Sequence, residues 1–182
     1  PYVYGELLPD DGSAARLENK KFTSSALMFF WGVEGERSPE LLHHNVFLAD
    51  GRYRQSFDRI FKDLTLPDQP SFYVNAATRT EPGFAPQGGD SLMALVPVGH
   101  LDDRKEQDWP ALEQRARETV IERLESLGVK DLGKRITFEA KWGPPYYRKA
   151  LNLAKGAAFG LSHNFLQVGY LRPHNRHPRY GN

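Results

Sequence analysis

The six histidines are the side chains of this sequence that could bind a metal or exchange a proton near neutral pH. His43 and His44 are adjacent, so on a strand they would point to opposite faces and could not hold one ion together. His174 and His177 lie in a proline-framed segment with no carboxylate nearby in the sequence. We therefore expect no metal site.

Patterns for covalent catalysis and for phosphate binding are missing as well. The chain has no cysteine, which excludes disulfides, thiolate catalysis and cysteine-ligated metal clusters. The pair Ser162-His163 lacks the G-x-S-x-G context of a hydrolase nucleophile. Gly88-Gly89 lacks a third glycine and precedes a strand, so it reads as a turn and not as a dinucleotide-binding loop.

Apolar and aromatic density is the most distinctive property of the chain, whose residues are 12% aromatic. Such rings could build the core of an ordinary domain or line a cavity for an apolar ligand, and composition leaves both open. The rings that stand out are Phe29, Phe30, Trp31, Phe72, Tyr73, Trp142, Tyr146, Tyr147, Phe159, Phe165 and Tyr170.

Charge and chain ends limit the partners that we expect. With 24 Lys and Arg against 23 Asp and Glu, the chain has no global field to attract nucleic acid, so we expect no nucleic-acid partner. No apolar run approaches the roughly 18 residues that a membrane span needs. The sequence starts at Pro1 without Met, and residues 179–182 carry no stop signal, so we expect a piece of a longer protein.

Hydrophobic periodicity predicts interleaved strands and helices. The helix of residues 110–127 has the clearest limits, because Asp108 can cap its start and Gly128 can end it. A second amphipathic helix is expected over 53–62, and a short one over 13–17. Strands are expected over 22–33, 44–49, 71–77, 91–98, 135–142 and 166–171.

The loop lengths do not consistently fit parallel crossover units. We therefore predict an α+β fold, with a mixed, largely antiparallel sheet covered by helices, over a doubly wound fold. Residues 1–21 are expected to form a connecting arm, 22–171 the main lobe and 172–182 a separate terminal segment.

Several ordered strings resemble consecutive blocks of the fungal-type phytoene desaturases, carotenoid dehydrogenases of the flavin amine-oxidoreductase superfamily. The resemblance covers nearly the whole chain. The strings are SSALMFFWG (24–32), HHNVFLA (43–49), FDRIF (57–61), LPDQPSFYVN (66–75), APQGGD (85–90), LVPVGHL (95–101) and RPHNR (172–176).

The resemblance implies a substrate-binding lobe over residues 22–171, in which a sheet roofs the flavin and helices enclose an apolar tunnel. It implies that residues 172–182 return toward a flavin domain, and that FAD is bound mainly by glycine-rich segments absent from this chain. Substrate-binding residues are expected among Phe30, Trp31, Phe72, Tyr73, Trp142, Tyr146 and Phe159.

The chemistry that the resemblance implies is stepwise desaturation of phytoene, a C40 polyene, with hydride passing to FAD and a proton lost from the adjacent carbon. His163 and His174 are the candidate catalytic proton acceptors, with His100 and Asn164 as further candidates. Because the block RPHNR precedes a flavin motif in the family, the candidate cofactor-binding residues are Arg172, Pro173 and Asn175.

An insoluble substrate implies a peripheral, membrane-associated, intracellular enzyme, with the helix of 53–62 or that of 110–127 as the contact. The intact enzyme could also form a homo-oligomer. Two other functions remain open. One is a non-catalytic binding module for apolar lipids or carotenoids, and the other is a different flavin carotenoid oxidoreductase or isomerase.

Overall fold

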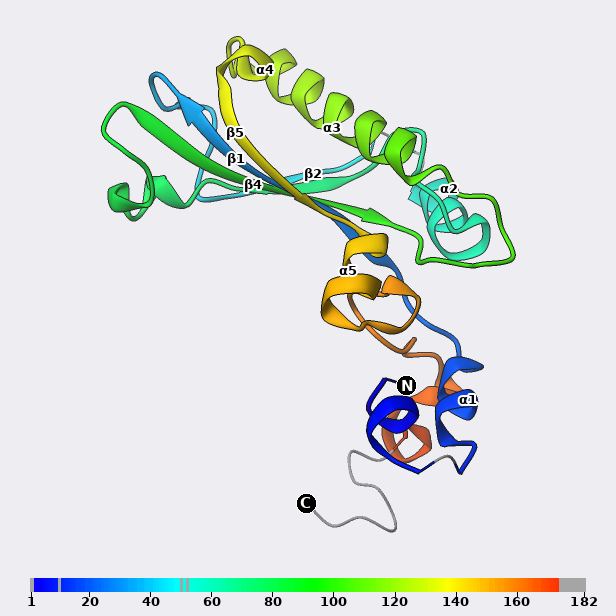
Figure 1. Ribbon diagram of the computed structural model, residues 1–182. Coiled ribbons are helices and arrows are strands. Elements are labelled where there is room, and N and C mark those ends of the chain that lie inside the picture. Colours follow the sequence, from blue (N-terminus) through cyan, green and yellow to red (C-terminus); the bar gives the residue numbers. More distant parts are fainter. Residues whose placement is uncertain (1, 10, 50, 52, 174–182) are drawn as a thin grey trace.

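The computed structural model describes residues 2–9, 11–49, 51 and 53–173. Its centre is a five-stranded sheet with the strand order β2-β3-β4-β1-β5 (Figure 1). Each pair of neighbouring strands is antiparallel, which confirms the predicted α+β class and makes the sheet fully antiparallel where a mixed one was allowed. The strands are β1 (Ser25–Glu34), β2 (His44–Phe47), β3 (Phe72–Asn75), β4 (Gly89–Val98) and β5 (Ile136–Trp142).

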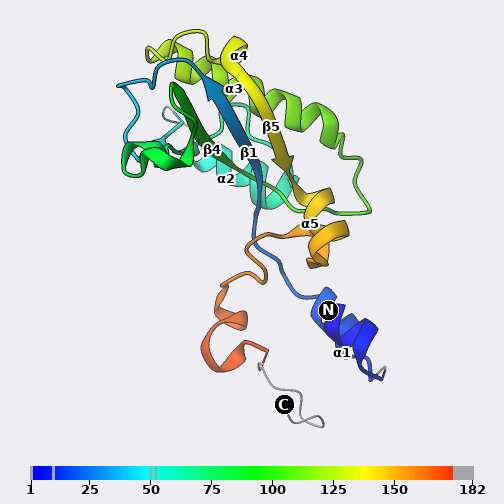
Figure 2. The ribbon, with the colours of Figure 1, turned by 60° about the vertical axis from the view of Figure 1, so that its left-hand side comes forward.

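The longest helix, α3 (Trp109–Ser126), lies along one face of this sheet (Figures 1 and 2). The carboxylate of Asp108 accepts a hydrogen bond from the Ala111 backbone N–H at 3.1 Å, as the predicted N-cap requires. Ala116, Val120 and Leu124 are fully buried against the sheet because they recur at helical spacing. The prediction of this helix is confirmed.

The remaining helices are shorter. The predicted helix of 53–62 forms as α2 (Tyr53–Asp58), which continues as a π-helical turn over Arg59–Asp63, and the predicted helix of 13–17 forms as α1 (Ser13–Glu18). Two more helices flank β5, namely α4 (Leu132–Arg135) and α5 (Pro144–Leu151). Single turns lie at Val3–Leu7, Ala77–Arg79, Pro82–Phe84 and Ala154–Gly156.

The predicted strand over 166–171 is wrong, because two 3-10 turns, Phe165–Gln167 and Gly169–Leu171, take its place. A strand needs a neighbour to satisfy its backbone hydrogen bonds. Here the side-chain amide of Gln167 instead bonds both backbone groups of Lys21, at 2.9 and 2.8 Å. The segment is therefore tied to the chain by a side chain.

The chain enters and leaves the sheet at one place. Phe22 and Leu161 form an isolated antiparallel bridge, and the Thr23 N–H donates to the Gly160 carbonyl at 2.9 Å. The Ser25 hydroxyl adds a buried hydrogen bond to the Gly156 carbonyl at 2.6 Å. The segment that contains α1 and the segment after Leu161 consequently both lie beyond the same end of the sheet (Figures 1 and 2).

The sheet is apolar on both faces. Leu27, Phe29, Trp31 and Val33 of β1 face α3 and are at most 5% exposed. The alternating residues of β1 are half-buried on the opposite face, along which no helix of the described part runs (Figures 1 and 2). An antiparallel sheet with a solvated face normally carries polar residues there, so this face differs from an ordinary outer surface.

Candidate functional site: the open face of the sheet

The uncovered side of the sheet, here called the open face, is defined by the strand register. Residues paired across antiparallel strands point to the same side, so the pairings arrange the side chains in rows that cross the sheet. One row runs through Val46, Tyr73, Leu95, Met28 and Trp142, a second through His44, Asn75, Met93, Phe30 and Ala140, and a third through Ser91, Gly32 and Phe138.

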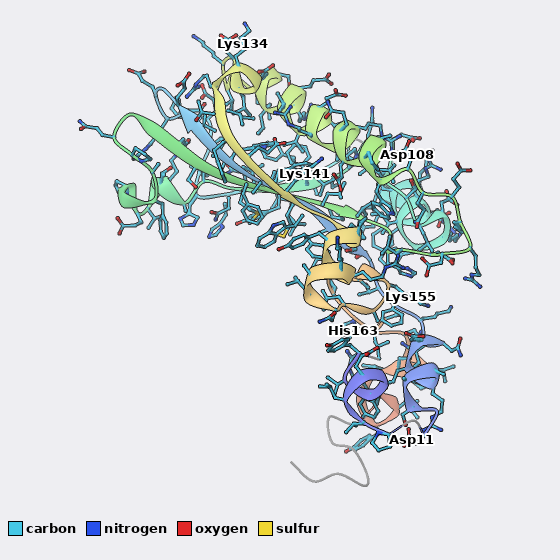
Figure 3. All side chains as sticks on the ribbon, viewed as in Figure 1. Asp11, Asp108, Lys134, Lys141, Lys155 and His163 are labelled. Carbon is cyan, nitrogen blue, oxygen red and sulfur yellow. The ribbon has the colours of Figure 1, made fainter. Side chains whose placement is uncertain are left out.

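Strand β5 shows how strongly its two faces differ. Toward α3 it presents Glu139 and Lys141, which form ion pairs with Arg117 at 2.6 Å and with Glu113 at 2.7 Å (Figure 3 labels Lys141). Toward the open face it presents apolar residues, among them Phe138, which is 63% exposed. Strand β5 therefore carries its charges on the side of α3 and its rings on the open face, and an exposed apolar surface of this kind is typical of an interaction site.

Aromatic rings gather at the β5 end of the open face. The ring centroids of Phe30 and Trp142 are 4.8 Å apart. Trp142 in turn stacks on Tyr146 with nearly parallel planes and a centroid distance of 5.4 Å. Gly143 precedes α5 at a point where a Cβ atom would lie 2.8 Å from Cδ2 of Leu27, and the start of α5 after it brings Tyr146 over Trp142. The next residue, Tyr147, points inward, and burial raises its pKa to about 12.

A hollow of about 200 Å³ adjoins Phe30 on this face. Phe84 borders it from the turn over Pro82–Phe84, and Met93 and Phe138 line it from the sheet. Its floor includes Gly32, where a Cβ atom would come within 3.2 Å of the Cβ of Phe138. The hollow is thus lined mainly by small and apolar residues, with Asn75, Asp90 and Ser91 as its polar members.

Polar groups are concentrated at the opposite, β2 end. The Nδ1 atom of His44 lies 2.6 Å from the hydroxyl of Tyr73, and the side-chain amide of Asn75 donates to the same hydroxyl at 3.2 Å. His43 and His44 were expected to point to opposite faces of a strand, but β2 begins only at His44. The alternation therefore does not apply to His43, and the centroids of the two imidazole rings are 4.2 Å apart. The described residues include no cluster of three or more His, Asp or Glu suited to a metal.

Four of the predicted substrate-binding residues lie together on the open face: Phe30, Tyr73, Trp142 and Tyr146. Their sequence neighbours Trp31 and Phe72 do not, because successive residues of a strand point to opposite faces. Trp31 is 2% exposed, and its indole N–H donates to Glu139 at 2.6 Å.

Phe72 is likewise in the core, where it stacks on Phe47 at 4.7 Å. Phe159 follows the turn Ala154–Gly156 and is half exposed, beyond the end of the sheet.

The predicted catalytic and cofactor residues lie elsewhere or outside the described part. His163 is exposed on the segment that leaves the sheet, away from the open face (Figure 3). Arg172 and Pro173 are half-buried, and Nη1 of Arg172 has no hydrogen-bond partner within the described part of the chain. His174 and Asn175 are outside the described residues.

His100, a further candidate, ends up beside Phe22 at the exit of β4, and burial lowers its pKa. Sequence reasoning considered His44 only as a metal ligand and did not single out Asn75 as a site residue. The polar string HHN at 43–45 was a signal, but the partner of His44 lies 29 residues away and was not visible in it.

The described residues do not fit the phosphates of a dinucleotide such as FAD. Such a site needs a glycine-rich turn that leads from a strand into the N-terminus of a helix. Gly88 and Gly89 instead lead into strand β4. The open face offers instead a largely apolar surface with a shallow hollow beside Phe30, which is suited to covering a ring system.

Comparison with known proteins finds relatives of this chain by sequence. No family model matches the chain. A phytoene desaturase of Fusarium fujikuroi is 38% identical over 199 aligned residues, which cover 100% of this chain and 35% of the relative. The zeta-carotene-forming phytoene desaturase of Myxococcus xanthus is 42% identical over 184 residues, covering 100% and 35%. A phytoene desaturase of Neurospora crassa is 39% identical over 182 residues, covering 96% and 30%.

The chain belongs to the phytoene desaturases by sequence. It spans about a third of the length of the curated relatives that it matches. The open face is thus a surface of the region that this chain shares with these relatives. No helix in the described part of this region is long and apolar enough to cross a membrane.

Proposed function

We propose that residues 22–171 form the substrate-facing lobe of an FAD-dependent phytoene desaturase, which introduces double bonds stepwise into phytoene. The observation that carries this proposal is the open face, an apolar sheet surface along which none of the described helices runs and which α5 covers only at Trp142, through Tyr146. The names of the relatives supply the substrate, and the face supplies the means of holding it.

The chemistry of an unfunctionalised hydrocarbon fits this surface. Phytoene offers no group for a salt bridge, so its binding depends on the apolar area removed from water, roughly 25 cal/mol per Å². Because strands lie about 4.8 Å apart, the two rows that cross all five strands are roughly 19 Å long, and the row that crosses three strands is roughly 10 Å long. The row from Val46 to Trp142 is long enough to hold a stretch of an extended polyene.

FAD would accept the hydride when bound. We propose that segments beyond residues 1–182 hold its phosphates, and that residues 172–182, including Arg172, Pro173, His174 and Asn175, lead the chain back toward it. The half-buried Arg172, whose Nη1 lacks a partner among the described residues, is compatible with a contact to another part of the enzyme.

We further propose that α2 and the π-helical turn after it contact a membrane surface, from which a water-insoluble substrate would enter. Tyr53, Phe57 and Phe61 form a continuous series of exposed rings, with centroids 4.8 and 5.1 Å apart. Exposed rings on one helical face are suited to the interfacial layer of a bilayer. Sedimentation with lipid vesicles, compared between the wild type and Phe57→Ser, tests this contact.

A chimera tests the proposed activity. The matched third of the Neurospora crassa relative is replaced by this chain, and phytoene consumption is measured by chromatography in cells that accumulate phytoene. We expect an active, flavin-loaded protein. A folded and flavin-loaded chimera that leaves phytoene unchanged would overturn the proposal.

A matched pair of variants tests the role of the open face in the same chimera. Phe138→Glu places a charge on the open face at a side chain that is 63% exposed, so the fold is retained and phytoene consumption falls at least tenfold. Leu42→Glu changes a similarly exposed residue that is not on the open face, and activity is expected to stay within twofold. Equal activities of the two variants would remove the open face from substrate binding.

A further inference from the structure

His44 and Tyr73 are the only residues with titratable side chains in the three rows of the open face. They are hydrogen-bonded to each other at 2.6 Å. Both lie at the β2 end, and Tyr73 belongs to the same row as Leu95, Met28 and Trp142. A hydrocarbon that follows this row would therefore bring its carbon atoms to the Tyr73 hydroxyl.

Asn75 fixes the direction of the hydrogen bonds in this group. The amide nitrogen of Asn75 can only donate, so the Tyr73 oxygen accepts its hydrogen. When His44 is neutral with an unprotonated Nδ1, the hydrogen of the Tyr73 hydroxyl points to that Nδ1, and the imidazole proton is on Nε2. The Tyr73 oxygen is thereby left with a lone pair directed away from both partners.

We propose that Tyr73 is a catalytic residue that accepts the proton released during desaturation, and that His44 is the positioning residue that takes over the hydroxyl hydrogen. This inference rests on the proposed function and assigns roles that it leaves open. An acceptor of the flavin class, held by another part of the enzyme, would take up the hydride that leaves with both electrons of one substrate C–H bond. The adjacent C–H bond then breaks, and its electron pair forms the new C=C bond.

The proton from that second bond passes to the Tyr73 oxygen as the original hydroxyl hydrogen moves to Nδ1 of His44. The result is a neutral tyrosine and an imidazolium, so charge and atoms balance. A carbon next to a developing cation is strongly acidic, so a weak base is sufficient. Val46 and Leu95 are the apolar neighbours of Tyr73 in its row, where a hydrocarbon would lie.

The first test needs no catalysis. Nitrogen NMR of the imidazole of His44 in the 182-residue chain, assigned by comparison with His44→Gln, reports which ring nitrogen carries the proton. We expect the Nε2–H form in the wild type and loss of this preference in Tyr73→Phe. A neutral His44 with its proton on Nδ1 in the wild type would overturn the relay.

The second test measures turnover in the chimera with the Neurospora crassa relative. Tyr73→Phe removes one oxygen and keeps the ring, so we expect kcat to fall about 10²-fold with KM nearly unchanged. His44→Gln should lower kcat similarly, and the double variant should be no slower than Tyr73→Phe because the two residues act as one unit.

His43→Gln is the control for this test, because His43 is the neighbouring histidine but bonds Thr80 at 2.5 Å instead of Tyr73. Its kcat is expected within twofold of the wild type. An active chimera in which Tyr73→Phe retains full kcat would overturn the relay alone. An inactive but folded, flavin-loaded wild-type chimera would overturn the proposed function, and the relay with it.

Discussion

Arg79 and Asp90 form a two-point ion pair at the start of β4, with nitrogen–oxygen distances of 2.9 and 3.0 Å. The Asp90 side chain is 4% exposed and also accepts a hydrogen bond from the hydroxyl of Thr78. Arg79 donates further to the carbonyls of Ser38 and Leu41, at 3.0 and 2.9 Å. One guanidinium therefore joins the loop after β1 to the start of β4, where Asp90 lines the hollow on the open face.

Removing one partner of this pair should strongly destabilise the protein. Asp90→Ala leaves the Arg79 guanidinium, only 16% exposed, without its counter-charge, and we expect a loss of about 3–5 kcal/mol in the free energy of unfolding. Urea denaturation measures it. The control is Asp103→Ala. This substitution removes the exposed ion pair between Asp103 and Arg148, which should contribute no more than about 1 kcal/mol to the free energy of unfolding. Similar losses in both variants would contradict this assignment.

Phe29 and Phe30 should behave differently although they are adjacent. Phe29 is 1% exposed under α3, so Phe29→Ala should cost about 3–5 kcal/mol of unfolding free energy. Phe30 lies half-buried on the open face, so Phe30→Ala should cost less than about 2 kcal/mol. Binding of an apolar fluorescent dye should fall in Phe30→Ala. An equal loss of stability in the two variants would mean that both rings are core residues.

His100 should make stability depend on pH. Burial lowers the pKa of its imidazole, with smaller opposing contributions from the Leu101 carbonyl and Asp102 and further lowering by Lys155 and Lys105. The unfolded chain then binds a proton more readily than the folded protein does. The contribution of the buried, neutral imidazole to the free energy of unfolding is therefore fully present above the ordinary histidine pKa of about 6.5, and it is lost as the pH falls toward the lower pKa of His100 in the folded protein.

The measurement for His100 is the free energy of unfolding between pH 7 and pH 5 in the wild type and in His100→Gln. The wild type should lose more stability over this interval than the variant. Parallel curves would show that His100 does not contribute.

Gly156 should not tolerate a side chain. Its φ is +56°, and a Cβ atom there would lie 2.2 Å from the carbonyl oxygen of Pro144. Gly156→Ala should therefore cost clearly more than the roughly 1–2 kcal/mol of left-handed backbone strain. Gly160 has a φ of +71°, but a Cβ atom there would meet no other atom within 4 Å. The loss of stability in Gly160→Ala therefore measures the left-handed backbone strain without a steric clash. Thermal unfolding of the two variants measures the difference in their stability. Equal midpoints would argue against the close approach of Gly156 to the Pro144 carbonyl.

Local patterns in the sequence were sufficient for most of the elements. The spacing from Leu112 to Leu124, with Asp108 before it, predicted α3 because helix period and cap are properties of neighbouring residues. The ordered blocks also indicated the family. The segment 166–171 was misread because its composition suits a strand but no strand pairs with it.

The sequence by itself determined a chain rich in apolar strands, a capped amphipathic helix and the phytoene desaturase family. Only the tertiary structure decided which of two adjacent rings faces α3, because β1 is apolar at both alternating sets of positions and offers no polar face to orient it. The same holds for the bond between His44 and Tyr73 and for the pair of Arg79 and Asp90. Strand register brings His44 to Tyr73, and the loops before β4 bring Arg79 to Asp90. Residues that are adjacent in the sequence predict neither the register nor the loop conformation.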